Sequence, residues 1–260
     1  MTRFHRLELD PRQRAPSAAT AKPAASASSD PDALQEADQH RRGGRFEESL
    51  RCYSRALEFD RSIAVAWLGQ VQMLIELEEY PEAELWSRKA LELFRDNGDL
   101  MASRAQALCR IGEVHQAQPL SDAALAQRDQ SAYRWLVRGE IMLRRKEAME
   151  QHCFDKAQLL DPDWLILLET ARIYMHHRRP ANALVRVRIA AERAPQEAYC
   201  WYLKGCIEAD LGFIPAARLS LERCLGLSPK HTQARDRLQH LKYEGRGLSR
   251  VWSWLRPLRS

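Results

Sequence analysis

The sequence predicts an all-α protein made of repeated helix pairs, and three observations support this. Like residues recur every 34 positions, as with Ala56, Ala90 and Ala124, or Pro195 and Pro229. Small residues stand at regular places inside each period, and glycine or proline stands where a helix would end. A fixed period of this length is typical of a solenoid, in which each helix pair packs mainly on its neighbours.

Six units fit this period between residues 30 and 231, and each is predicted to be a pair of helices. They are 30–63, 64–97, 98–131, 132–163, 164–197 and 198–231. The fourth unit is 32 residues long. It lacks one residue near its helix–helix turn, and the linker to the fifth unit lacks another.

Close packing explains why the helices accept glycine. In the last unit the large Trp201 is followed four residues later by Gly205, although glycine inside a helix costs roughly 1 kcal/mol relative to alanine. A small residue there lets the second helix of the pair approach. We therefore expect Gly205→Leu to destabilise the fold by overpacking, and Gly205→Ala to be mild. Gly212, like Gly44 and Gly112, is expected to form a turn between helices.

This pattern resembles the tetratricopeptide repeat family over residues 30–231. The period, the spacing of large and small residues, the turn glycines and the helix-ending Pro162, Pro195 and Pro229 carry the resemblance. It implies a right-handed superhelical solenoid whose first helices line a concave groove. It also implies a non-enzymatic adaptor or scaffold that binds a peptide or helix of a partner protein in that groove. The family's clamp for chaperone C-termini is not matched, so that partner is not expected.

The candidate partner site lies on the first helices of the last three units, where the expected inward positions are rich in large apolar residues. The set is Tyr133, Leu136, Glu140, Leu165, Leu168, Arg172, Met175, Tyr199, Tyr202 and Cys206. Such a surface suits an apolar peptide. The alternative is that some of these side chains pack between helices, and we expect roughly half of them to reach the groove.

No motif of an enzyme, a cofactor site or a metal site occurs in the sequence. There is no GxSxG elbow, glycine-rich phosphate loop or HExxH helix. The pair His176 and His177 has no second pair of ligands, and a solvated helix end explains it better than a metal does. We therefore expect no catalytic residue, no cofactor and no bound metal.

Cysteine usage and hydropathy favour a cytoplasmic protein. The six cysteines occur singly, without a CxxC pair, which is typical of reduced, packed thiols. No apolar run approaches the roughly 20 residues that cross a bilayer, and the first residues do not resemble a secretory signal. Arginine outnumbers lysine and alanine is frequent, which favours a bacterial origin.

The segments outside the repeats have separate expected roles. Residues 1–29 are expected to be an arm and an Ala/Ser/Pro-rich linker without a packed core, and residues 232–244 a helix that covers the last unit. Residues 245–260 form a basic amphipathic tail whose expected contact residues are Arg250, Val251, Trp252, Trp254, Leu255 and Arg256. The tail could contact an anionic membrane peripherally, contact a partner, or pack against its own capping helix.

A basic edge supplies the main alternative function. The turns at 41–45, 144–146 and 178–179 carry arginine or lysine, and stacking of the units would place them along one edge. The excess of positive charge is mild, because 40 basic residues face 35 acidic ones for a net charge of +5. Through this edge and the tail the protein would bind nucleic acid or an anionic membrane surface, and nucleic acid is the less expected of the two. Such binding would weaken steeply with salt.

Overall fold

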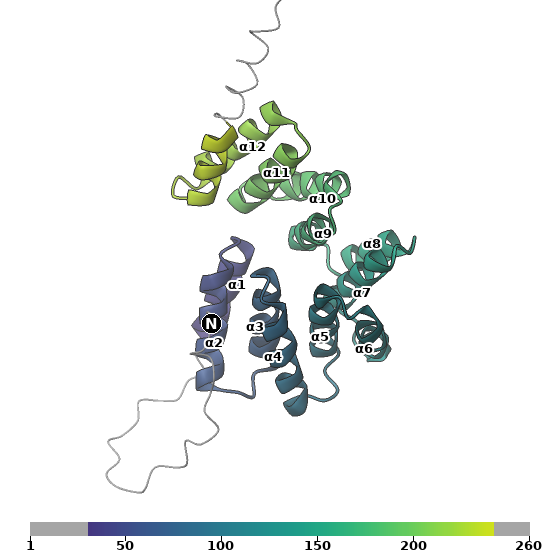
Figure 1. The fold of residues 1–260 in the computed structure, drawn as a ribbon. Coiled ribbons are helices and arrows are strands. Elements are labelled where there is room, and N and C mark those ends of the chain that lie inside the picture. The colour runs from purple at the N-terminus through teal and green to yellow at the C-terminus, as the bar shows by residue number, and fades with distance from the viewer. Residues whose placement is uncertain (1–30, 242–260) are drawn as a thin grey trace, which may run out of the picture.

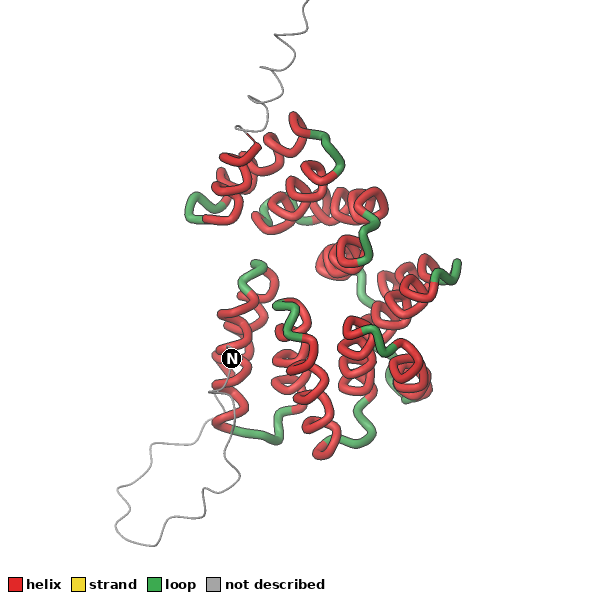
Figure 2. Tube along the Cα trace, in the orientation of Figure 1, coloured by secondary structure: helices red, strands yellow, loops and turns green. Residues whose placement is uncertain are grey.

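The computed structural model describes residues 31–241, which form an all-α solenoid without strands in that range (Figures 1 and 2). Short loops join the helices into six hairpins, numbered here in chain order. The helices are α1 (Pro31–Arg42), α2 (Phe46–Phe59), α3 (Ala64–Glu76), α4 (Tyr80–Leu93), α5 (Gly98–Ile111), α6 (Val114–Ala126), α7 (Ala132–Arg145), α8 (Glu150–Leu160), α9 (Trp164–His176), α10 (Pro180–Arg193), α11 (Ala198–Asp210) and α12 (Ile214–Leu227). Residues 232–241 are also helical. The predicted fold class is confirmed.

The turn inside every hairpin contains one residue in the left-handed region. Gly44, Gly112 and Gly212 adopt φ values of 71°, 110° and 79°, in agreement with the expected turn glycines. The other three hairpins place Glu78, Lys146 and Arg178 at φ between 56° and 63°. A side chain in this conformation is strained by its Cβ, so these turns are held by the packing of the helices they join.

Close helix contact surrounds Gly205, as the sequence predicts. A Cβ added to Gly205 would lie 2.8 Å from Cγ of Leu221 and 3.2 Å from the carbonyl oxygen of Ala217, both on α12. Even one methyl group therefore requires α12 or the Leu221 side chain to shift. The expectation that Gly205→Ala is mild stays a prediction, and so does the larger cost expected of Gly205→Leu, whose longer side chain would meet the same atoms.

The helix at residues 232–241 covers the end of the solenoid. Ala234, Leu238 and Leu241 are buried in one cluster with Leu221 and Cys224 of α12. Residues 242–244 of the predicted capping segment, the arm at 1–29 and the tail at 245–260 lie outside the described residues. The expected tail contacts at Arg250, Val251, Trp252, Trp254, Leu255 and Arg256 lie there too.

Hairpin 4 is the irregular one and changes the course of the chain. Its second helix, α8, has 11 residues where the other second helices have 13 or 14, and its linker to α9 is residues 161–163. Helix α9 packs on α7 and α8 less extensively than α3, α5 and α11 pack on the hairpins before them. Beyond this junction α9 and α11 lie across from α1, so the two ends of the solenoid face each other (Figure 1).

Candidate functional site

The two ends of the solenoid are joined by the turn of hairpin 1. We call residues 41–46 the closing turn. Arg41 donates a hydrogen bond of 2.8 Å from Nη1 to Oε1 of Glu169 in α9. Arg42 donates to Asp163, the N-cap residue of α9, with Nη1 and Oδ1 3.3 Å apart, and its guanidinium lies 5.4 Å from the ring centre of Trp164. The concave side is thus crossed by two ion pairs between hairpins 1 and 5.

An aromatic contact completes this closure. Phe46 meets Tyr199 of α11 edge to face, with ring centres 6.0 Å apart. The guanidinium of Arg172 lies 4.5 Å from the ring centre of Phe46, and it also pairs with Glu76 of α3. Gly44 lies so close to Tyr199 that an added Cβ would be 2.2 Å from Cε2 of that ring. We call Asp163, Trp164, Glu169, Arg172 and Tyr199 the floor on which the closing turn lies.

A second buried polar cluster surrounds Glu140 of α7. Gln106 donates a hydrogen bond of 2.8 Å to Oε2 of Glu140, and Arg110 pairs with Oε1. Nε2 of His177 lies 3.1 Å from the same Oε1, and a carboxylate can only accept, so the histidine donates there. Burial alone would raise the pKa of Glu140, but Arg110 and His177 outweigh it and lower the pKa to about 2. Glu140 is therefore an ionised centre that ties α5, α7 and α9 together.

Two groups of side chains have the composition of metal ligands. The ligand atoms of Glu140, His176 and His177 lie within 4.8 Å of one another, and those of Glu36, His40 and Cys52 do so as well. In the first group Arg110 already neutralises Glu140, and in the second Arg55 lies 2.7 Å from Oε2 of Glu36. A guanidinium beside the carboxylate repels a metal cation and occupies the ligand oxygen, so neither group favours a metal.

The structure places the ten predicted groove residues in two classes. Leu136, Glu140, Leu165, Leu168 and Tyr199 are buried. Tyr133, Arg172, Met175, Tyr202 and Cys206 are partly buried. In this closed arrangement the closing turn covers the floor, and the three leucines of the set are buried among the helices. Binding of a partner by these ten residues stays a prediction.

A small cavity lies among the first helices, next to Arg41 of the closing turn. Arg41, Glu76, Tyr133, Glu169 and Arg172 border a cavity of about 20 Å³, which holds roughly one water molecule. Charged and polar side chains of the protein itself therefore make up much of the wall of this cavity.

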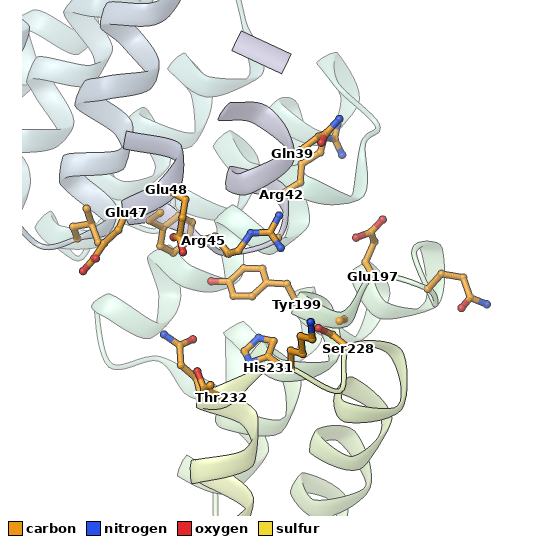
Figure 3. A pocket seen from close by; sticks show the side chains of 18 residues that line it. Gln39, Arg42, Arg45, Glu47, Glu48, Glu197, Tyr199, Ser228, His231 and Thr232 are labelled. Atoms are coloured by element: carbon orange, nitrogen blue, oxygen red, sulfur yellow. The ribbon is translucent and has the colours of Figure 1, made fainter. Parts of the chain in front are cut away.

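A larger cleft opens beside the closing turn, between hairpin 1 and the last hairpin (Figure 3). It has a volume of about 870 Å³, and we call it the end cleft. Tyr199 and His231 reach into it from one side and Arg45 from the other (Figure 3). Its charged lining residues are Arg42, Arg45, Glu47, Glu48, Glu197 and Lys230.

The closing turn is the element of the candidate site that the sequence did not reveal. Arg41 and Arg42 are expected on a solvated basic edge, but both turn inward to carboxylates on α9 and at its N-cap. Arg41 and Glu169 are 128 residues apart, so no local pattern links them. Arg144, Lys146, Arg178 and Arg179 of the predicted edge are solvent-accessible.

Comparisons with known proteins agree with this architecture. Residues 34–98, which span the first two hairpins, match the tetratricopeptide repeat family. The solved structure of TTC0263, a tetratricopeptide repeat protein of Thermus thermophilus, is similar with a TM-score of 0.50 at 14% identity, over 82% of this chain and 98% of that one. Among curated proteins, none matches the sequence.

Two further solved structures show weaker similarity. A tetratricopeptide repeat protein from Parabacteroides merdae has 18% identity and a TM-score of 0.49, over 81% of this chain and 83% of that one. The Cut9–Hcn1 hetero-tetramer of the APC/C has 15% identity and a TM-score of 0.49, over 80% of this chain. This chain spans 42% of the matched chain there.

Residues 34–98 therefore match the tetratricopeptide repeat family, and the described helices share the fold of a solved tetratricopeptide repeat protein. Folds of this family generally mediate protein–protein interactions. No helix in residues 31–241 is long and apolar enough to cross a membrane.

Proposed function

We propose that this protein is a non-enzymatic adaptor that binds a segment of a partner protein. In this proposal the segment enters through the end cleft and lies along α7, α9 and α11, the helices that carry the ten predicted groove residues. The end cleft carries the proposal, because its volume of about 870 Å³ is within the usual range of roughly 300–1,000 Å³ for binding pockets. Tyr199 lines the cleft and is also one of the ten predicted groove residues, which supports an entry path beside them.

The chemistry of the end cleft favours a peptide over a nucleic acid. Its lining has three basic residues, Arg42, Arg45 and Lys230, and three acidic ones, Glu47, Glu48 and Glu197. A phosphate backbone would meet as much repulsion as attraction there, whereas a peptide offers groups of both signs. Phe46, Tyr199 and His231 add ring surface on which side chains can pack.

Site-specific photocrosslinking tests this proposal. The photoreactive residue p-benzoylphenylalanine replaces Gln233 or Glu48 on the end cleft in two variants, and the protein is irradiated in extract of its native cells. We expect both variants to form adducts with the same protein, and the crosslinked peptides to come from one segment of it. Mass spectrometry of the adducts then identifies that partner.

Leu219 of α12 supplies the matched control. Its side chain is 68% exposed and does not line the cleft. The Leu219 variant should give none of the adducts that the cleft variants give. Adducts formed by the Leu219 variant and by neither cleft variant would refute the proposal.

The exposed basic residues support a second candidate function. Arg144, Lys146, Arg178 and Arg179 are solvent-accessible on the turns of hairpins 4 and 5. Together with the tail at 245–260 they would contact an anionic membrane surface peripherally. Flotation with anionic liposomes tests it, since binding should fall with added salt and in a Trp252→Ala, Trp254→Ala variant.

The proposed setting is the cytoplasm. All six cysteines are free thiols and five of them are buried, which suits a reducing compartment.

A further inference from the structure

The closing turn fills the floor with a specific set of side chains. Arg41 meets Glu169, Arg42 meets Asp163 and Trp164, and Phe46 meets Tyr199. Each contact joins a basic or aromatic side chain of hairpin 1 to an acidic or aromatic side chain of hairpins 5 and 6. The floor is thus already occupied by a segment of the same chain, the closing turn.

We propose that the closing turn is an internal competitor for the partner site, and that the partner segment resembles it. That segment carries two adjacent arginines and an aromatic residue four positions after the second one, and it binds by displacing the closing turn from the floor. The proposal rests on the proposed function and adds the chemistry of the partner to it.

The acidic residues of the floor require an occupant with positive charge. Among the described contacts, Arg41 is the basic group that pairs with Glu169, whose side chain is 18% exposed. Burial raises the pKa of Glu169 although Arg41 acts against that rise. An apolar occupant would leave this carboxylate without a counter-charge in a largely dry place, which is unfavourable. Only a segment that brings its own cation can replace Arg41 without that loss.

The closure is built so that it can open. It consists of side-chain contacts, and among residues 31–241 no backbone hydrogen bond joins hairpin 1 to hairpins 5 and 6. The side chains of Arg42 and Asp163 are 33% and 28% exposed, so water reaches this ion pair. The sparse packing between hairpins 4 and 5 provides a place where the solenoid can bend. The end cleft leaves one side of the closing turn accessible to an incoming segment.

A peptide copied from the closing turn is the probe for this inference. Fluorescein-labelled QHRRGGRFE, residues 39–47 of the chain, is titrated with full-length protein and followed by fluorescence anisotropy. The wild type should bind it weakly, because its own turn occupies the floor. The release variant Arg41→Ser, Arg42→Ser frees the floor and should bind at least about tenfold more tightly, as removal of an internal competitor requires.

Matched controls locate the binding on the floor. In the release background, Asp163→Asn with Glu169→Gln keeps the shape and the N-cap of α9 but removes both charges, and binding of the probe should be lost. A probe with serine in place of its two adjacent arginines should not bind any variant. Equal affinity of the wild type and the release variant, or no binding by the release variant, would overturn the inference.

A charge swap covers the case in which the release variant loses its helices. Arg41→Glu alone should increase the radius of gyration in small-angle scattering, and Arg41→Glu with Glu169→Arg should restore it. No increase in the single variant would likewise overturn the inference. Photocrosslinking reports on the natural partner independently of the peptide probe. If adducts form at the end cleft but the probe does not bind the release variant, the proposed function stands and this inference is overturned.

Discussion

Gly44→Ala adds one methyl group to the closing turn, and its effect can be worked out from two contacts. Gly44 has φ of 71°, so an alanine there adopts the left-handed region at a cost of roughly 1–2 kcal/mol. The new Cβ would also lie 2.2 Å from Cε2 of Tyr199, more than 1 Å inside ordinary contact. Overpacking of this kind costs about 1–3 kcal/mol. We therefore expect a total loss of about 2–5 kcal/mol in the free energy of unfolding.

Gly212→Ala is the control that separates the two costs. Gly212 occupies the same place in hairpin 6 with φ of 79°, and nothing lies within 4 Å of a Cβ added there. It should lose only the roughly 1–2 kcal/mol of backbone strain. The difference between the two variants measures the overlap with Tyr199. The steric overlap with Tyr199 can cost more free energy than the contacts of the closing turn contribute. In that case the solenoid opens, and the difference in unfolding free energy between the two variants equals the contribution of those contacts.

Urea unfolding followed by circular dichroism gives both free energies, and small-angle scattering shows whether Gly44→Ala opens the solenoid. Equal losses in Gly44→Ala and Gly212→Ala, with unchanged scattering, would refute the contact between Gly44 and Tyr199.

Three further predictions concern stability. Gly205→Ala should lose about 1 kcal/mol and Gly205→Leu about 3 kcal/mol or more in urea unfolding, because both crowd α12; no loss in the leucine variant would contradict the helix contact. The pKa of Glu140 is about 2 in the folded state against an ordinary value of 4.5. Ionised Glu140 therefore contributes about 3 kcal/mol at most to the free energy of unfolding. This contribution is complete above pH 4.5 and is lost as the pH falls towards 2. Glu140→Gln should be less stable at neutral pH and should lose less stability on acidification, and parallel pH profiles would contradict this. Arg178→Gly should gain about 0.5–1 kcal/mol, because glycine relieves the left-handed backbone at φ of 56°, and a loss would show that the arginine side chain stabilises the turn.

The fold was predictable because each repeat encodes its own packing. The 34-residue period and the small residue at Gly205 report contacts between neighbouring helices, and α3, α5, α7, α9 and α11 begin at the first residues of their predicted units. The cost of Gly205→Ala depends on the 2.8 Å separation between an added Cβ and Cγ of Leu221, which no sequence pattern specifies.

The contact of hairpin 1 with hairpins 5 and 6 was not predictable, because it depends on how each repeat is oriented relative to the one before it, summed over several repeats. Arg41 and Arg42 stand in a glycine-containing turn, a pattern that normally marks solvent. Helix α9, which follows the shortened hairpin 4, lies opposite that turn, where Glu169 and Asp163 supply the counter-charges. The exposure of the predicted groove residues depends on the same closure: Tyr199, for example, is covered by Gly44 and Phe46 from the other end of the solenoid.

Electron spin resonance tests the closure of the solenoid most directly. Spin labels are attached to unnatural amino acids at residues 48 and 233, which lie on opposite sides of the end cleft, so the six native cysteines are left intact. Double electron–electron resonance should give one narrow distribution of short distances in the wild type, and a broader distribution of longer distances in the Arg41→Ser, Arg42→Ser variant. A broad distribution of long distances already in the wild type would contradict the closed solenoid.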